Sequence, residues 1–173
     1  MNLILKDIRQ KALWMYEAQG AREIFRVIMS DGTSAMFYFR LASAFSNNRW
    51  SLIFALILRR LNLILNGIVV GRGASIGGGF VIMHSVGVVI NGKAVLGQCC
   101  VVQSGVVIGS VEKKSPIIGD RVHFGAGCKV LGGVKIGNDV KIGANAVVVS
   151  DVPSGATIVG IPAKMVRLHG KRV

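Results

Sequence analysis

Three histidines are the side chains of this sequence best suited to proton transfer near neutral pH. A positioned imidazole, with an unperturbed pKa of about 6.5, can take the proton of a hydroxyl group as that group attacks an electrophile. His84 falls in a break of an otherwise regular repeat, where loops inserted in a rigid scaffold tend to carry function. His123 occupies an outward repeat position and His169 lies in a basic C-terminal stretch, so both are expected at the surface.

The remaining reactive side chains are the thiols of Cys99, Cys100 and Cys128. Their odd count and spacing do not indicate a disulfide framework, so we expect free thiols in a reducing cytoplasm. The N-terminus lacks the basic region, apolar run and cleavage site of a secretory signal. The longest apolar run, Leu52 to Leu58, ends at two arginines and is too short to span a bilayer, so a cytoplasmic protein is expected.

A six-residue repeat positions His84. From Val70 onward an aliphatic residue recurs every six positions, usually followed by Gly and then by a small or branched residue four places on. The repeat is broken near His84 and again over residues 110–117. A unit this short suits one strand and one corner of a coil, with successive coils stacked about 4.8 Å apart. The pattern therefore predicts an all-β parallel β-helix.

The first 66 residues have a helical rather than a six-residue period. Breaks are expected at Gly20, at the turn Asp31–Ser34, which would cap a third helix, and at Asn47–Asn48. A fourth helix, from about Trp50 to Leu65, is apolar on nearly every side and must be covered by a neighbouring subunit or a membrane surface. The predicted organisation is an α-helical region at 1–66, a β-helix domain at 67–166 and a basic tail at 167–173.

Charge narrows the range of partners. The formal net charge is +13, and the basic residues are spread along the chain rather than gathered in a tail. This favours a phosphorylated cofactor, an anionic glycan or an acidic membrane surface, while a solvated basic surface is the plain alternative. No nucleic-acid-binding motif is present, so no nucleic-acid partner is expected.

Four segments carry a resemblance to a known family. They are residues 84–91 (HSVGVVIN), 124–127 (FGAG), 142–145 (IGAN) and 159–164 (VGIPAK). With the hexapeptide repeat, they make the chain similar to the hexapeptide-repeat acetyltransferases, in the serine acetyltransferase branch and near the O-acetyltransferases of capsule and exopolysaccharide synthesis. The resemblance implies a left-handed β-helix, a homotrimer, and acetyl-CoA as co-substrate in a groove between subunits.

The same resemblance assigns roles to individual residues. It makes His84 the general base, with no metal in the site. Asp31 and Lys114 are matched, more loosely, to acceptor-binding positions, and a turn or cap remains the alternative role for Asp31. The positions matched to acetyl-CoA binding are Gly109, Ser110, Ala126, Ala144, Gly160 and Lys164.

Several positions depart from the serine enzymes. In those enzymes an aspartate supports the histidine and another precedes it, but the matching residues here are Val69 and Met83. Lys114 keeps the positive charge of an Arg-His-Pro segment, and Ser115 replaces its imidazole. His84 would therefore need another orienting group, such as a backbone carbonyl, or would act unaided. The departures favour an acceptor without an ammonium group, such as a sugar hydroxyl.

Three functions follow from these observations. The preferred one is acetyl-CoA-dependent O-acetylation of a sugar or polysaccharide precursor, and its alternative within the family is serine O-acetylation in cysteine biosynthesis. A third is a non-catalytic trimeric scaffold at the membrane surface, since the apolar fourth helix would also suit peripheral contact with the inner membrane. A γ-type carbonic anhydrase, which shares the β-helix, is not favoured because no suitable pair of histidines follows His84.

Overall fold

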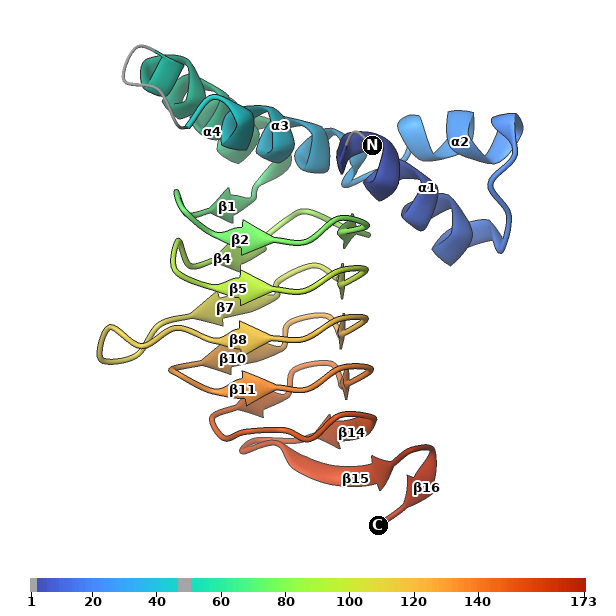
Figure 1. The fold of residues 1–173 in the computed structure, drawn as a ribbon, viewed down its shortest axis with the longest axis vertical. Helices are drawn as coiled ribbons and strands as arrows, with labels where there is room; N and C mark the ends of the chain where they lie inside the picture. Colours follow the sequence, from blue (N-terminus) through green and yellow to red (C-terminus); the bar gives the residue numbers. More distant parts are fainter. Residues whose placement is uncertain (1–2, 47–50) are drawn as a thin grey trace.

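The computed structural model describes residues 3–46 and 51–173 and confirms a parallel β-helix preceded by helices (Figure 1). Short strands stack into three sheets, and each turn of the coil adds one strand to each sheet. The first sheet contains β1 (Val69–Val70), β4 (Val89–Ile90), β7 (Val107–Gly109), β10 (Lys129–Leu131) and β13 (Val147–Val148). The second contains β2 (Ser75–Ile76), β5 (Val95–Leu96), β8 (Ile117–Ile118) and β11 (Lys135–Ile136). The third begins with β3 (Val81–Ile82), β6 (Val101–Val102), β9 (His123–Phe124), β12 (Lys141–Ile142) and β14 (Ala156–Val159).

The repeated aliphatic residues fill the interior of the coil, as the hexapeptide pattern predicts. Strands pair in parallel and in register, so each inward side chain stacks on its counterpart one turn away. Along the third sheet the stacked column is buried throughout, and it consists of Ile82, Val102, Phe124, Ile142 and Ile158. Burial of these columns stabilises every turn through its neighbours, and it fixes the register of the corners.

The helical region is built from α1 (Leu3–Tyr16), α2 (Ala21–Ile28), α3 (Thr33–Ala44) and α4 (Ser51–Asn66). The predicted break at Gly20 is confirmed, since this residue directly precedes α2. The turn at Asp31–Ser34 is also present, but Gly32 is the residue before α3 and no side chain caps the helix there. The predicted break at Asn47–Asn48 and the predicted helix start at Trp50 lie outside the described residues.

Side chains from the helices cover the open edge of the first turn. The upper edge of a solenoid exposes backbone groups that no further turn can pair. The Arg40 guanidinium donates to the carbonyl oxygens of Ile76 (2.8 Å) and Gly77 (2.6 Å), at the end of β2. The Arg59 guanidinium donates to the carbonyl oxygen of Val70 (2.6 Å), at the end of β1.

The same edge is covered near β3 by an acid and a thioether. One oxygen of Asp7 accepts the backbone N–H groups of Gly79 (2.8 Å) and Phe80 (2.9 Å). The sulfur of Met36 accepts the N–H of Ile82 at 3.3 Å. Each of the three edge strands is therefore met by a polar or sulfur group from the helical region, and Figure 1 shows this region lying across one end of the solenoid.

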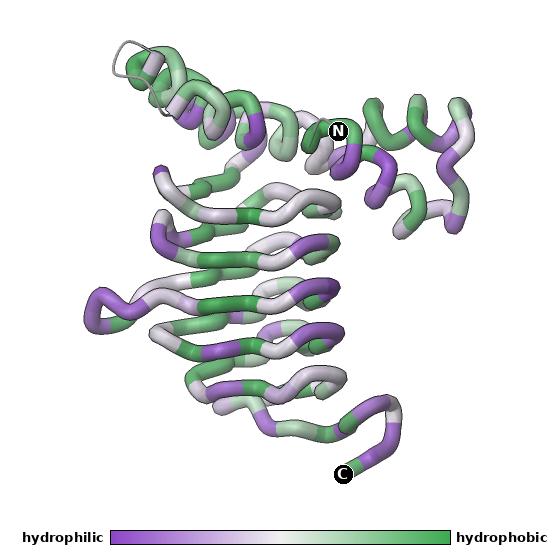
Figure 2. The backbone as a smooth tube through the Cα atoms, viewed as in Figure 1, coloured by the Kyte–Doolittle hydropathy of each residue, from purple (hydrophilic) through white to green (hydrophobic). Residues whose placement is uncertain are grey.

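The fourth helix is apolar, as predicted (Figure 2), and most of its residues are not buried in the single chain. Only Ala55, Leu58 and Asn62 are buried, and they face α3 and β1. The side chains of Ile53 and Ile64 are 64% and 68% exposed. Within residues 3–46 and 51–173, no helix has the length and apolarity needed to cross a membrane.

The C-terminal residues do not form the simple basic tail that the sequence suggests. β15 (Lys164–Leu168) turns back to pair antiparallel with β14, and β16 (Lys171–Arg172) pairs antiparallel with β15. This hairpin extends the third sheet past the last parallel turn and covers its lower edge. The change from parallel to antiparallel pairing cannot be inferred from a hexapeptide period.

The buried ion pair between Arg40 and Asp7 predicts a strong effect of mutation. Burial raises the pKa of the Asp7 carboxyl, while Arg40 and two backbone N–H groups act in the opposite direction. Arg40→Ala leaves a buried carboxylate without its cation and should lower the free energy of unfolding by about 3–5 kcal/mol. Chemical denaturation measures this loss. The control Arg121→Ala, which breaks the exposed pair with Asp139, should leave the midpoint nearly unchanged; equal effects would contradict the capping role of Arg40.

Candidate active site

His84 lies in the turn between β3 and β4, where two extra residues enter the repeat. Gly87 has a positive φ of 74°, and its N–H donates to the carbonyl oxygen of Gly67 at 3.0 Å. Ser85 is buried beneath the turn, whereas the side chain of His84 is 60% exposed. The turn thus has a fixed backbone and presents the imidazole at one corner of the coil.

A carboxylate contacts this imidazole. Nδ1 of His84 lies 2.9 Å from Oδ2 of Asp31, and the Asp31 side chain is 54% exposed. Because an ionised carboxylate only accepts hydrogen bonds, the contact favours the tautomer with its proton on Nδ1 and with Nε2 as the basic nitrogen. The sequence-based expectation that His84 relies on a backbone carbonyl or acts unaided is therefore wrong. Sequence reasoning missed the contact because its two residues are 53 positions apart.

Four hydrogen bonds hold the turn that carries Asp31, and two of them involve Asp31 itself. Its Oδ1 accepts the N–H of Gly32 at 2.7 Å, and its backbone carbonyl accepts a hydrogen bond from Lys11. The ammonium group of Lys11 also donates to Oγ1 of Thr33 at 3.1 Å. Oγ1 of Thr33 in turn donates to the carbonyl oxygen of Val27 at 2.6 Å. A buried lysine on α1 therefore ties together the turn that carries Asp31.

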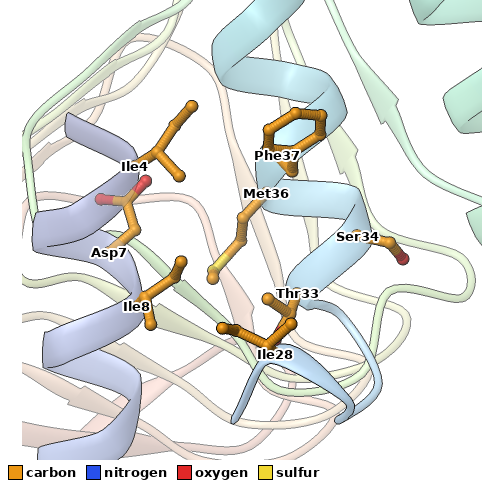
Figure 3. A pocket seen from close by; sticks show the side chains of 8 residues that line it. All are labelled: Ile4, Asp7, Ile8, Ile28, Thr33, Ser34, Met36 and Phe37. Atoms are coloured by element: carbon orange, nitrogen blue, oxygen red, sulfur yellow. The ribbon is translucent and has the colours of Figure 1, made fainter. Parts of the chain in front are cut away.

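A pocket beside this turn separates α1 from α3, and Figure 3 shows apolar side chains of both helices facing one another across it. His84 is not among its lining residues, so the pocket is not the reaction site. The lining consists of Ile4, Asp7, Ile8, Ile28, Thr33, Ser34, Met36 and Phe37.

Three residues matched to acetyl-CoA binding lie along the same edge of the third sheet as His84. The register of the third sheet aligns Ile82, Phe124, Ile142 and Ile158. The residues two places beyond these are His84, Ala126, Ala144 and Gly160, so all four lie just past the end of the third sheet. Because of the two extra residues in its turn, His84 projects from this edge, and Val86 takes the corner position, where its carbonyl oxygen accepts the N–H of Gly105 at 2.9 Å. Ala126 and Ala144 are exposed, and the carbonyl oxygen of Ala126 accepts the N–H of Asn145 at 2.8 Å.

The same register identifies a residue that the sequence analysis did not consider. Ser104 lies two places beyond Val102, in the turn between that of His84 and that of Ala126. Its carbonyl oxygen accepts the N–H of Gly127 at 2.8 Å, and the residue is partly exposed. Extending the hexapeptide frame by two places in every turn could have found it.

Gly109, Ser110 and Lys114 lie at a different corner of the coil from His84. Gly109 ends β7, and Ser110 begins the loop that leads to β8 and contains Lys114. Asn91 anchors this loop, because it donates to Oγ of Ser110 (3.2 Å) and accepts from Oγ of Ser115 (3.0 Å). Lys164 lies on β15 and is exposed. One chain therefore divides the predicted residues between two corners of the coil.

The remaining histidines and the thiols have surroundings unlike those of His84. His123, expected at the surface, packs beneath α1 with its ring centroid 5.1 Å from that of Trp14, and its Nε2 is buried without a hydrogen-bond partner among the described residues. Burial, with the charge of Lys141, lowers the pKa of His123. His169 is exposed, as predicted. All three cysteines are free. Burial raises the thiol pKa of Cys100 to about 11 and that of Cys128 to about 12.

Comparison with known proteins places this site in a family. The model of the bacterial transferase hexapeptide (six repeats) matches residues 115–150. The serine acetyltransferase of Helicobacter pylori (strain ATCC 700392 / 26695) is 41% identical over 157 residues, which is 88% of this chain and 91% of that protein. That of Staphylococcus epidermidis (strain RP62A) is 35% identical over 176 residues, covering 98% of this chain and 82% of the relative. The chain belongs to the serine acetyltransferase family.

Solved structures agree with this assignment. The serine acetyltransferase of Neisseria gonorrhoeae in complex with serine has a TM-score of 0.83 and 30% identity, covering 95% of this chain and 68% of its own. A serine acetyltransferase in complex with CoA has a TM-score of 0.81 and 27% identity, covering 93% of this chain and 68% of its own. This serine acetyltransferase family member is an acetyl-CoA-dependent acyltransferase that acts on a hydroxyl group. The comparisons do not support the expected likeness to capsule and exopolysaccharide enzymes.

The described residues of this family member include no group of three His, Cys, Asp or Glu side chains placed to hold a metal ion. Asp31 is the charged group that contacts His84, and the buried Lys11 interacts with the charge of Asp31. Burial lowers the pKa of Lys11 from 10.5 to about 8, while the charge of Asp31 acts to raise it.

The lowered pKa of Lys11 predicts a pH dependence of stability. Between about pH 8 and 10.5 the unfolded chain holds more protons at this residue than the folded chain, so its contribution to stability increases with pH. The free energy of unfolding of the wild type, relative to Lys11→Met, should increase by up to about 3 kcal/mol across that window. Denaturation series from pH 7.5 to 10 measure it. The buried thiols lower stability as pH rises, but they do so in both proteins, so the difference between wild type and Lys11→Met cancels their effect. If the free energies of unfolding of the two proteins changed in parallel with pH, the prediction would be wrong.

Proposed function

We propose that this enzyme transfers the acetyl group of acetyl-CoA to the hydroxyl of L-serine, with His84 as the general base. The observation that carries this proposal is the 41% identity to a serine acetyltransferase over 88% of the chain, together with an exposed imidazole that meets a carboxylate at Nδ1. The serine alternative of the sequence analysis therefore replaces its preference for a sugar or polysaccharide precursor.

The proposed reaction needs a single proton acceptor. Nε2 of His84 takes the proton of the serine hydroxyl as the oxygen attacks the thioester carbon. The tetrahedral intermediate collapses with cleavage of the C–S bond, and the departing thiolate takes the proton back from Nε2. The products are O-acetylserine and CoA, and the imidazole is restored to its starting state.

The edge of the third sheet beside His84 offers a binding surface for the extended arm of CoA. Successive turns lie about 4.8 Å apart, so Gly160, four turns from His84, is roughly 19 Å away along the axis of the coil. Small side chains at Ala126 and Ala144 leave room for a chain lying against the corners. We assign these three residues to CoA binding, with Lys164 as a cation for a phosphate group.

The second corner completes the site across a subunit boundary in this proposal. Gly109, Ser110 and Lys114 share a corner with one another but not with His84. In a cyclic homotrimer, two different corners of identical chains face each other at every interface. Lys114 of one chain would then lie near His84 of the next and bind the acceptor, for which a serine carboxylate is a suitable partner.

Two partners proposed from the sequence, a neighbouring subunit and a membrane surface, would each fit the exposed apolar face of α4. A neighbouring subunit would cover Ile53 and Ile64, and an acidic membrane surface would also bury them. A non-catalytic scaffold would use the same face. The acceptor assays below test that alternative.

Acceptor assays separate the possible functions. CoA release from acetyl-CoA should depend on L-serine, and His84→Ala should lower the rate by at least a factor of about 100 because no other base replaces the imidazole. His169→Ala, at an exposed histidine far along the chain, is the matched control and should retain full activity. Turnover with capsule-type sugars but not with serine would restore the sugar acceptor, and full activity of His84→Ala would remove the catalytic role of His84.

Mixed oligomers test whether two subunits form the site. His84→Ala and Lys114→Ala should each be impaired alone, and co-expression should restore activity because some interfaces then contain both wild-type residues. Random assembly of a trimer gives about a quarter of the wild-type activity. The measurement is serine-dependent CoA release by the purified mixture. Activity no higher than that of the separate variants would contradict an intersubunit site.

A further inference from the structure

The geometry points to Asp31 as the positioning residue of His84, which makes the helical region part of the catalytic apparatus. This inference rests on the proposed function for the reaction in which the imidazole takes part. It concerns a residue that the sequence analysis matched to acceptor binding or to a turn.

The first argument is the tautomer that the contact selects. Oδ2 of Asp31 lies 2.9 Å from Nδ1 of His84, so the carboxylate holds the proton on Nδ1 and leaves Nε2 as the base. The same carboxylate stabilises the imidazolium that forms when Nε2 takes the acceptor proton. A neutral amide in its place could donate to Nδ1 and shift the proton to Nε2, where it would block the base.

The second argument is that both carboxylate oxygens have partners. Oδ1 accepts the N–H of Gly32 at 2.7 Å, which limits rotation of the side chain while Oδ2 meets the imidazole. Binding an acceptor ammonium group would require sharing or losing one of these contacts. The arrangement is thus that of a group held for the histidine.

The third argument is the backbone docking that delivers Asp31. Gly32 has a positive φ of 76°, and a Cβ added there would lie 2.3 Å from the carbonyl oxygen of Ile82. Ile82 precedes His84 by two residues, and its N–H also donates to the sulfur of Met36 at 3.3 Å. The turn that carries Asp31 therefore rests directly on the end of the strand that leads to His84.

The fourth argument concerns what the pair does not do. Both side chains are more than half exposed, and exposed ion pairs contribute little to stability. Folding is stabilised instead by the buried contacts of Arg40 and Lys11. The Asp31 carboxylate therefore acts on which nitrogen of His84 carries the proton. Solvent exposure does not remove this effect.

The test compares three variants at residues of matched exposure. Asp31→Asn removes the charge with little change of shape, and Asp31→Glu keeps a carboxylate. Asp139→Asn removes an equally exposed carboxylate that pairs with Arg121 on the far part of the coil. We expect Asp31→Asn to lower kcat about 10- to 100-fold, less than for a fully buried triad aspartate because this site is open to solvent. Asp31→Glu should retain more activity, and Asp139→Asn should match the wild type.

Two readouts distinguish positioning from acceptor binding and from a structural role. Loss of positioning lowers kcat with the KM for serine nearly unchanged, whereas loss of an acceptor contact raises that KM. Nitrogen-15 NMR of labelled histidine reports the tautomer of His84 without any acceptor, and His84→Ala assigns its signals among the three histidines. Asp31→Asn should shift the proton from Nδ1 toward Nε2 while the unfolding midpoint stays within experimental error.

Each outcome decides the inference. An unchanged tautomer in Asp31→Asn, a higher KM with kcat retained, or an activity loss explained by a lower unfolding midpoint would overturn it. A shifted tautomer with the expected loss of kcat supports it. If the wild type acetylates no serine, the proposed function fails, and the tautomer measurement alone then decides whether Asp31 positions His84.

Discussion

The open edge of the first turn is the constraint around which this protein is organised. A stack of parallel turns satisfies its backbone internally except at its ends, where the exposed N–H and C=O groups must find other partners. Here the helical region supplies them through Arg40, Arg59, Asp7 and Met36. The buried pair between Arg40 and Asp7 is retained at the cost of desolvating two charges, because both ions also bond to the backbone of the edge.

Capping and catalysis use the same surface. The cap must approach the end of β3 closely, and only a glycine at position 32 permits that approach next to the carbonyl oxygen of Ile82. His84 lies two residues after Ile82, at the corner of the same turn. Because Gly32 docks against Ile82, the side chain of the preceding residue, Asp31, lies beside the imidazole. The regular coil then repeats the end of the third sheet in every turn, which places Ser104, Ala126, Ala144 and Gly160 along the edge that begins at His84.

The repeat made much of this arrangement predictable. A six-residue period specifies which residues point inward and which share a corner, so the β-helix and the position of His84 at a break followed from spacing alone. Contacts between the helices and the coil have no such period. The meeting of Asp31 with His84 depends on how one helical turn docks, and the burial of His123 depends on where Trp14 of α1 comes to rest. The antiparallel C-terminal hairpin escaped prediction for the same reason, since the hexapeptide pattern ends before it.

The distribution of acids links the base to the choice of acceptor. No Asp or Glu occurs between Asp31 and Glu112, although this stretch contains the first two turns, His84 and most of the helical cap. Such a surface attracts the phosphates of acetyl-CoA and a carboxylate on the acceptor. Asp31 is therefore the acid that this surface retains beside His84, in a chain whose positions 69 and 83 are apolar. Its two carboxylate oxygens already meet Gly32 and His84, so an acceptor ammonium group would have to displace one of these contacts. The side chain is thus committed to the base, and recognition of the acceptor falls to other groups.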